Sequence, residues 1–468
     1  MKKFRWLFVI LAVLCVGITT LALASCSSDE GSGEKMTFVS DGNGGYVLSK
    51  YEGNADNLRL PDMYNGAPVT QIGTEAFMHC GKLTHVKIPE SVTKIGTRAF
   101  AECYNLATVS LGTKIEIIDT EAFKNCYKLD LKIPSSVKTI GDSAFSECNS
   151  LKAADLPKGL VSLGKSAFNK CKSITAVTIP EAITVLPDGI FADCSKLSSI
   201  TLHDKVFSIG ASAFAGCHSI TELELPSSIY TIGQRAFLLC TNITTITIPT
   251  GVTVIEDELF ANCIKLTSPV LHEGITKIGS KAFAECLALS SIEIPSSVTS
   301  IGSSAFSGCT ALTSVSLPAI ESVDGTFKDC IALTSVTLAE GTGSIGSSAF
   351  EGCAELSEIN IPSTITSVGF QAFAGCVKVT ELHFADGLGE IGACAFIGCS
   401  GLQTVSLPAT LINVWDSAFA YCSSLTTINY GGSKSQWRAM NKSEGDPYIK
   451  EVLTWDHGTG DYTVNYNG

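Results

Sequence analysis

The chain has 468 residues, of which only 16% are charged, and its net charge is −13 at pH 7. An acidic balance repels polyanions, so nucleic-acid binding is not expected. Domain-size statistics would suggest about three globular domains for this length, but an internal repeat favours a single solenoid.

The N-terminus has the features of a secretory signal. Basic residues at positions 2, 3 and 5 precede an apolar run over residues 6–24. The run is long enough that an uncleaved transmembrane anchor is the alternative. However, Leu23-Ala24-Ser25-Cys26 resembles the lipobox of bacterial lipoproteins. The resemblance implies removal of a signal peptide, residues 1–25, and acylation of the Cys26 thiol.

Residues 26–35 are predicted to form a flexible tether. The acidic stretch Ser27-Ser28-Asp29-Glu30 looks like a surface-export signal of some Gram-negative lipoproteins. An ordinary solvated linker is the alternative, which Gly31-Ser32-Gly33 also suggests. The expected location is the bacterial outer membrane, with the protein anchored by its lipid and exposed at the surface.

Residues 36–70 are predicted to be an N-terminal cap. Apolar residues at 37–39 and 46–48 flank Asp41-Gly42-Asn43-Gly44-Gly45, which indicates a β-hairpin. A first short strand is expected at Leu58-Arg59-Leu60, followed by a turn at Tyr64-Asn65-Gly66. Solenoids need such atypical terminal units to cover their open ends.

Residues 71–430 contain one unit sixteen times, represented by residues 344–366 with the sequence SIGSSAFEGCAELSEINIPSTIT. Sixteen cysteines, from Cys80 to Cys422, recur every 23 residues, except for steps of 22 before Cys148 and 21 before Cys330. A fixed period of this length predicts a solenoid, in which each unit buries its apolar side only against its neighbours.

Each unit divides into a strand and a turn. Residues 356–361 alternate between apolar and polar side chains, the pattern of a strand with one buried face, and a proline ends it in ten of the sixteen repeats. The repeat position of Gly346 is occupied by Pro187 and Trp415 in other repeats, so this position does not require a positive φ. Asp119 and Asp324 occupy it in two further repeats, which favours a helix N-cap. The next residues are therefore expected to form a short helical turn on the side opposite the strands.

Phe350, Cys353 and Leu356 represent the predicted structural core, and their slots are apolar throughout the repeats. Burying one phenylalanine side chain contributes roughly 1.5–3 kcal/mol. Cysteines stacked about 4.8 Å apart and pointing the same way do not suit disulfide geometry. The ladder is predicted to consist of free thiols that fill space.

The pattern CxxLxxVxIPxSVTxIGxxAF resembles the BspA-like bacterial leucine-rich repeats over about four fifths of the chain. The resemblance implies a leucine-rich-repeat solenoid with a parallel β-sheet and a role in surface interactions. Local departures occur: Pro269 is expected to break the strand at 268–270, and a short repeat suggests a kink near residues 318–330. After residue 430 the pattern stops, and residues 431–468 are predicted to be a C-terminal cap with a short helix at 435–440 and strands at 452–455 and 462–466.

The outward strand positions are mostly serine and threonine, with no aromatic residue. Such ladders stabilise parallel strands by themselves. The exception is a candidate interaction patch formed by Glu358, Asn360, Glu381 and His383. Because Glu358 and Glu381 hold the same slot in adjacent coils, their carboxylates should lie about 5 Å apart. A protonated His383, a bound cation or a basic group on a partner could offset their repulsion, although a solvated pair is the simpler alternative.

No catalytic motif, cofactor-binding motif or metal-ligand set occurs in the sequence, so an enzyme is not expected. The leading hypothesis is a cell-surface lipoprotein whose repeats present an extended face to protein partners, including host or matrix proteins, as in adhesion. A structural or periplasmic scaffold without a host partner is the alternative. A glycan-binding accessory lipoprotein is a third, disfavoured by the absence of aromatic side chains on the strand face.

Overall fold

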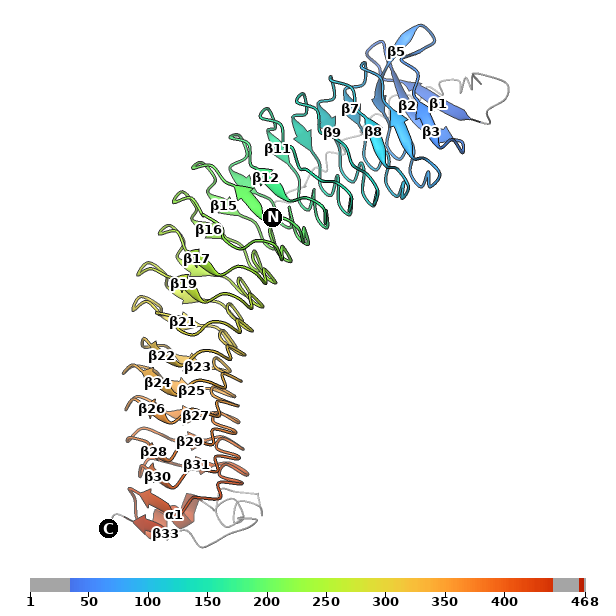
Figure 1. The fold of residues 1–468 in the computed structure, drawn as a ribbon. Coiled ribbons are helices and arrows are strands. Elements are labelled where there is room, and N and C mark those ends of the chain that lie inside the picture. The colour runs from blue at the N-terminus through green and yellow to red at the C-terminus, as the bar shows by residue number, and fades with distance from the viewer. Residues whose placement is uncertain (1–33, 441–462, 467–468) are drawn as a thin grey trace, which may run out of the picture.

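The computed structural model describes residues 34–440 and 463–466. The predicted signal peptide, Cys26 and nearly all of the predicted tether lie outside these residues. The described chain winds into a parallel β-solenoid whose axis curves between the green and the orange coils (Figure 1). The predicted solenoid with its parallel sheet is therefore confirmed.

Most coils have a first strand on one side of the solenoid, which we call the strand face, although the equivalent segments 130–132, 153–155, 222–224 and 291–293 are not strands. Its members form short parallel ladders, such as β22-β24-β26, rather than one continuous sheet. They are β3 (Asn57–Arg59), β6 (His85–Lys87), β8 (Thr108–Ser110), β12 (Ala176–Thr178), β14 (Ser199–Thr201), β17 (Thr245–Thr247), β19 (Ser268–Val270), β22 (Ser314–Leu317), β24 (Ser335–Leu338), β26 (Glu358–Asn360), β28 (Glu381–His383), β30 (Thr404–Leu407) and β32 (Thr427–Tyr430).

A second, two-residue strand follows in the same coil, and these strands form further parallel ladders that we call the second-strand face. They are β7 (Lys94–Ile95), β9 (Ile117–Ile118), β10 (Thr139–Ile140), β11 (Ser162–Leu163), β13 (Val185–Leu186), β15 (Ser208–Ile209), β16 (Thr231–Ile232), β18 (Val254–Ile255), β20 (Lys277–Ile278), β21 (Ser300–Ile301), β23 (Ser322–Val323), β25 (Ser344–Ile345), β27 (Ser367–Val368), β29 (Glu390–Ile391) and β31 (Asn413–Val414).

The third side of each coil is a ribbon of tight turns, not the predicted helical turn. Within one coil, the Cys353 N–H donates to the Phe350 carbonyl at 3.1 Å, while the Phe350 N–H donates to Ala372 of the next coil at 2.7 Å. Ser348 (φ 54°) and Gly352 (φ 76°) have left-handed backbone conformations and also donate to the next coil. Bonds between coils therefore replace the bonds that would build a helix.

The glycine slot before this ribbon allows the coils to approach closely. Gly346 and Gly369 do not have a positive φ, as predicted. A Cβ atom on Gly369 would lie 2.6 Å from the backbone carbon of Gly346. The predicted N-cap role of Asp119 is wrong because no helix follows it; its Oδ1 accepts a hydrogen bond from the adjacent Thr120 N–H at 2.8 Å.

Phenylalanine rings form the centre of the core. Consecutive rings from Phe77 to Phe419 are stacked, with centroids 4.8 to 6.1 Å apart, and Tyr51 of the cap covers the first ring at 5.1 Å. The stack continues through the short repeat, where Phe306 and Phe327 are 5.6 Å apart. A kink confined to residues 318–330 stays a prediction.

Pro269 does not break its strand, contrary to expectation. It lies within β19 and its Cα is paired with that of Ile246 in β17. The sheet contains only these two strands, so β19 is an edge strand, where a missing N–H is tolerated.

The expected terminal elements are present where the structure describes them. β1 (Lys35–Ser40) and β2 (Tyr46–Glu52) form an antiparallel hairpin, and β4 (Met63–Tyr64) turns into β5 (Ala67–Ile72). Helix α1 (Lys434–Met440) matches the predicted short helix, and β33 (Thr463–Tyr466) pairs in parallel with β32. The strand predicted at 452–455 lies outside the described residues.

Candidate interaction surface

The candidate patch lies on β26 and β28 of the strand face. Glu358 and Asn360 are exposed on either side of Ile359, and Glu381 and His383 are exposed on either side of the buried Leu382. The alternation predicted from the sequence therefore directs all four polar side chains outward.

The two strands of the patch do not pair with each other. β26 pairs with β24, and β28 pairs with β30, but no ladder joins β26 to β28. The second-strand ladder remains intact in the same coils, where β27 pairs with β29. The 5 Å separation was expected from the spacing of paired strands, and this pairing is absent between β26 and β28. The close approach of the Glu358 and Glu381 carboxylates therefore stays a prediction.

A hollow of about 480 Å³ accompanies this break. Its lining includes Ser335 and Thr337 of β24, Glu358 and Asn360 of β26, and Glu381 of β28. Carboxylate, amide and hydroxyl groups thus surround a shallow space on a face whose outward positions are mostly serine and threonine.

His383 lies beside Glu381, with Nε2 3.4 Å from the Glu381 Oε2 atom, and its Nδ1 is 3.0 Å from the Ser406 hydroxyl. Both residues of the pair are more than 60% exposed, so water screens the contact. Among the described residues, no Lys, Arg or His forms an ion pair with Glu358. A partner's cation could therefore approach Glu358 directly.

Phe350, Cys353 and Leu356 are fully buried in the common core. Each ladder cysteine after the first has a further contact that was not predicted: its thiol donates to the phenylalanine carbonyl of the preceding coil, as from Cys353 to Phe327 at 3.1 Å. Burial raises the pKa of the Cys353 thiol well above its usual value. The cysteine slot therefore supplies a hydrogen-bond donor as well as volume.

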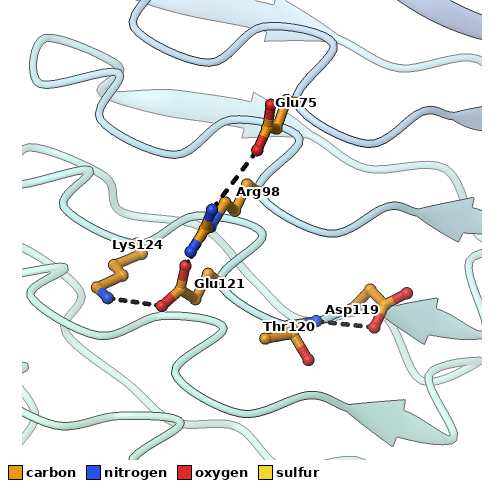
Figure 2. A network of polar contacts seen from close by, with 6 residues as sticks. All are labelled: Glu75, Arg98, Asp119, Thr120, Glu121 and Lys124. Carbon is orange, nitrogen blue, oxygen red and sulfur yellow. Dashed lines mark hydrogen bonds and ion pairs between the residues drawn. The ribbon is translucent and has the colours of Figure 1, made fainter.

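Charged side chains link successive coils on the turn ribbon. Figure 2 shows Arg98 between Glu75 and Glu121, with Lys124 on the other oxygen of Glu121 at 2.6 Å. The hydrogen bond from Lys124, together with that from Arg98, lowers the pKa of Glu121 despite its partial burial. These contacts join three coils and are structural rather than a binding site.

Two aromatic pairs outside the strand face were not predicted from the sequence; Tyr104, Tyr127 and Tyr230 are exposed and Phe207 is half-buried. Tyr104 stacks on Tyr127 with centroids 5.4 Å apart, and Phe207 stacks on Tyr230 at 5.3 Å. The members of each pair are 23 residues apart, so aromatic residues in one slot of consecutive repeats were the available signal.

Within residues 34–440 and 463–466, no group of three or more histidine, cysteine or acidic side chains could hold a metal ion. No helix in that part of the chain is long and apolar enough to cross a membrane.

Stacked parallel strands, a regular apolar core and 23-residue coils define a leucine-rich-repeat solenoid. The chain belongs to the family described as "BspA type Leucine rich repeat region", whose model matches overlapping segments between residues 54 and 440.

Two solved structures of bacterial proteins are similar to this chain. A leucine-rich repeat protein from Bacteroides ovatus is 26% identical, with 92% of this chain and 98% of that chain covered and a TM-score of 0.63. A leucine-rich cell surface protein from Faecalibacterium prausnitzii is also 26% identical, with 91% and 99% covered and a TM-score of 0.42. No curated protein matches the chain.

Proposed function

We propose that this protein is a surface-anchored lipoprotein whose strand face binds protein partners, as in adhesion to host or matrix proteins. The family and the solenoid support the coarser statement that it is a protein-interaction scaffold. The lipobox-like segment ending at Cys26 supports the anchor. The observation that carries the proposed binding role is the hollow between β24, β26 and β28, where exposed carboxylate and amide groups lie beside serine and threonine side chains.

The chemistry of this hollow favours a basic partner. Glu358 and Glu381 are both exposed, and the imidazole of His383 lies beside Glu381. A lysine or arginine of a partner would reduce the repulsion between the carboxylates and form charge-assisted hydrogen bonds with them. The break between β26 and β28 also leaves room for a partner side chain to enter.

Protease treatment of intact cells tests the surface location. We expect the protease to release repeat fragments, while a known periplasmic protein remains intact. Full protection of residues 71–430 on intact cells, with digestion after the outer membrane is opened, would favour the alternative of a periplasmic scaffold.

A glycan-binding accessory role remains the other alternative because exposed aromatic pairs do occur outside the strand face. Capture experiments distinguish the two roles. Recovery of a protein partner by immobilised residues 36–468 supports the proposal, whereas binding only on a glycan array supports the alternative.

A further inference from the structure

The second-strand face carries an apolar patch over four consecutive coils. Val161 is 63% exposed, Val185 44% and Tyr230 54%, and the ring of Phe207 is parallel to that of Tyr230 within 1°. Backbone hydrogen bonds join these coils directly, from Tyr230 to Phe207 at 3.0 Å and from Phe207 to Thr184 at 2.9 Å. Exposed aromatic and aliphatic side chains grouped in this way are typical of an interface.

Three lysines bordering this patch are already paired within the chain. Lys165 contacts Asp188 at 2.8 Å, Lys138 contacts Glu116 at 2.8 Å, and Lys205 contacts Glu181 at 2.6 Å. The neighbouring Thr231 hydroxyl donates to the Ser208 hydroxyl at 2.7 Å. An apolar centre with a polar, internally satisfied rim is the usual anatomy of a protein–protein interface.

The order of the four side chains makes the patch complementary to itself. Val161, Phe207 and Tyr230 hold the same slot of their coils, whereas Val185 lies one position further along its strand, in register with Ser208. A twofold axis between the coils of Val185 and Phe207 would place Val185 of one copy opposite Ser208 of the other and next to Phe207. The same axis would place Val161 against Tyr230. An isologous interface requires this kind of reciprocal match.

The charge distribution along the solenoid favours the same antiparallel arrangement. Residues 71–205 contain 16 lysines and arginines and 14 acidic residues, a net charge of +2. Residues 206–430 contain 6 and 19, a net charge of −13. A parallel pair would set the acidic halves side by side, whereas the antiparallel pair sets each acidic half against a nearly neutral one. On the contacting face, Lys138 of one copy, which also contacts Glu116 of its own chain, would lie near Glu256 and Asp257 of the other.

We propose that the patch of Val161, Val185, Phe207 and Tyr230 is the centre of a twofold, antiparallel dimer between two copies of this chain. Because the patch lies on the second-strand face, it leaves the hollow of the strand face free. The inference is therefore independent of the proposed function, and either can fail without the other.

Sedimentation velocity of the full chain in a mild detergent, over a wide range of protein concentrations, tests the dimer. We expect a reversible dimer whose dissociation constant rises at least about tenfold in a Phe207→Ser, Tyr230→Ser variant. The matched control is Tyr104→Ser with Tyr127→Ser, which removes the other exposed aromatic pair and should leave the dimer unchanged. An unchanged thermal unfolding curve shows that each variant is folded. A monomeric wild type, or an equal effect of both variants, would overturn the proposal.

Charge reversal tests the antiparallel register. Lys138→Glu alone and Asp257→Lys alone should each weaken the dimer, and the double variant should recover part of the loss because the new charges again oppose each other. A double variant that dimerises no better than either single variant would contradict this register.

Discussion

The thiol of Cys376 donates a hydrogen bond to the carbonyl oxygen of Phe350 in the preceding coil, over 3.1 Å. The same carbonyl accepts the N–H of Cys353 at 3.1 Å. One buried oxygen thus joins the turn of its own coil to the side chain of the next. This contact, repeated along the solenoid, explains why the slot carries cysteine and not an equally small apolar residue.

Replacement of Cys376 by alanine should destabilise the protein by about 1–3 kcal/mol. The variant loses the buried donor to the Phe350 carbonyl and leaves a small cavity in the core. Denaturant unfolding followed by circular dichroism measures the change, and Cys394→Ala, at a half-buried position, is the control. Equal stability of the two variants would show that the thiol contributes no useful contact.

Thiol labelling of the native protein should modify Cys394 and Cys80 well before the buried ladder cysteines. Cys80 is only half-buried and lines a hollow of about 220 Å³, and the neighbouring Cys103 thiol lowers the pKa of the Cys80 thiol. Burial instead raises the pKa of Cys376 to about 12, so almost no thiolate is available there. Mass spectrometry after brief alkylation identifies the sites; rapid labelling of Cys376 without denaturant, or disulfides between ladder cysteines, would contradict the structure.

Gly369→Ala should destabilise the protein by about 1–3 kcal/mol, because the new methyl group would meet the backbone of the preceding coil. Gly159→Ala is the matched control: nothing lies within 4 Å of its Cβ position. Gly159→Ala should be neutral, or should stabilise the protein by up to about 1 kcal/mol because alanine lowers the conformational entropy of the unfolded chain. Thermal unfolding of both variants checks the difference, and similar melting temperatures would argue against a close approach of coils at Gly369.

The ion pairs of Glu121 should make a small, pH-dependent contribution to stability. Because its pKa in the folded state is lowered from 4.5, the contribution is complete above that pH and disappears as the pH falls through the folded value. Arg98 is 47% exposed, so solvent screening limits the loss in Glu121→Gln to about 1 kcal/mol at neutral pH. Unfolding free energies at pH 7 and in acid check this; a deficit that persists undiminished in acid would assign the effect to packing instead.

Glu358→Gln combined with Glu381→Gln should weaken binding of a captured protein partner and leave stability equal or higher. Removing the two charges relieves their repulsion but also removes the groups that a basic partner would contact. Glu222→Gln with Glu224→Gln is the control, since both residues are exposed on the strand face away from the hollow. Unchanged partner binding by the Glu358→Gln, Glu381→Gln variant would show that the two glutamates are an ordinary solvated pair and not a binding site.

Much of the architecture followed from the sequence alone. The cysteine period, the Phe350 slot and the alternation at 356–361 determine a solenoid and its core, because each coil repeats the same environment and each slot keeps its burial. The outward direction of Glu358, Asn360, Glu381 and His383 followed in the same way from the period of two along a strand.

Only the tertiary structure decided how neighbouring coils meet. Ala349, Phe350 and Cys353 have a helical spacing in the sequence, but their segment is a ribbon of turns. The Phe350 N–H donates to the carbonyl of Ala372 in the next coil, and not to a carbonyl four residues earlier as it would in a helix. The gap between β26 and β28 depends on the relative placement of two coils that have equally good strand sequences. The patch of Val161, Val185, Phe207 and Tyr230 likewise forms only when four coils are stacked, since contacts between repeats, and not local preferences, bring these side chains together.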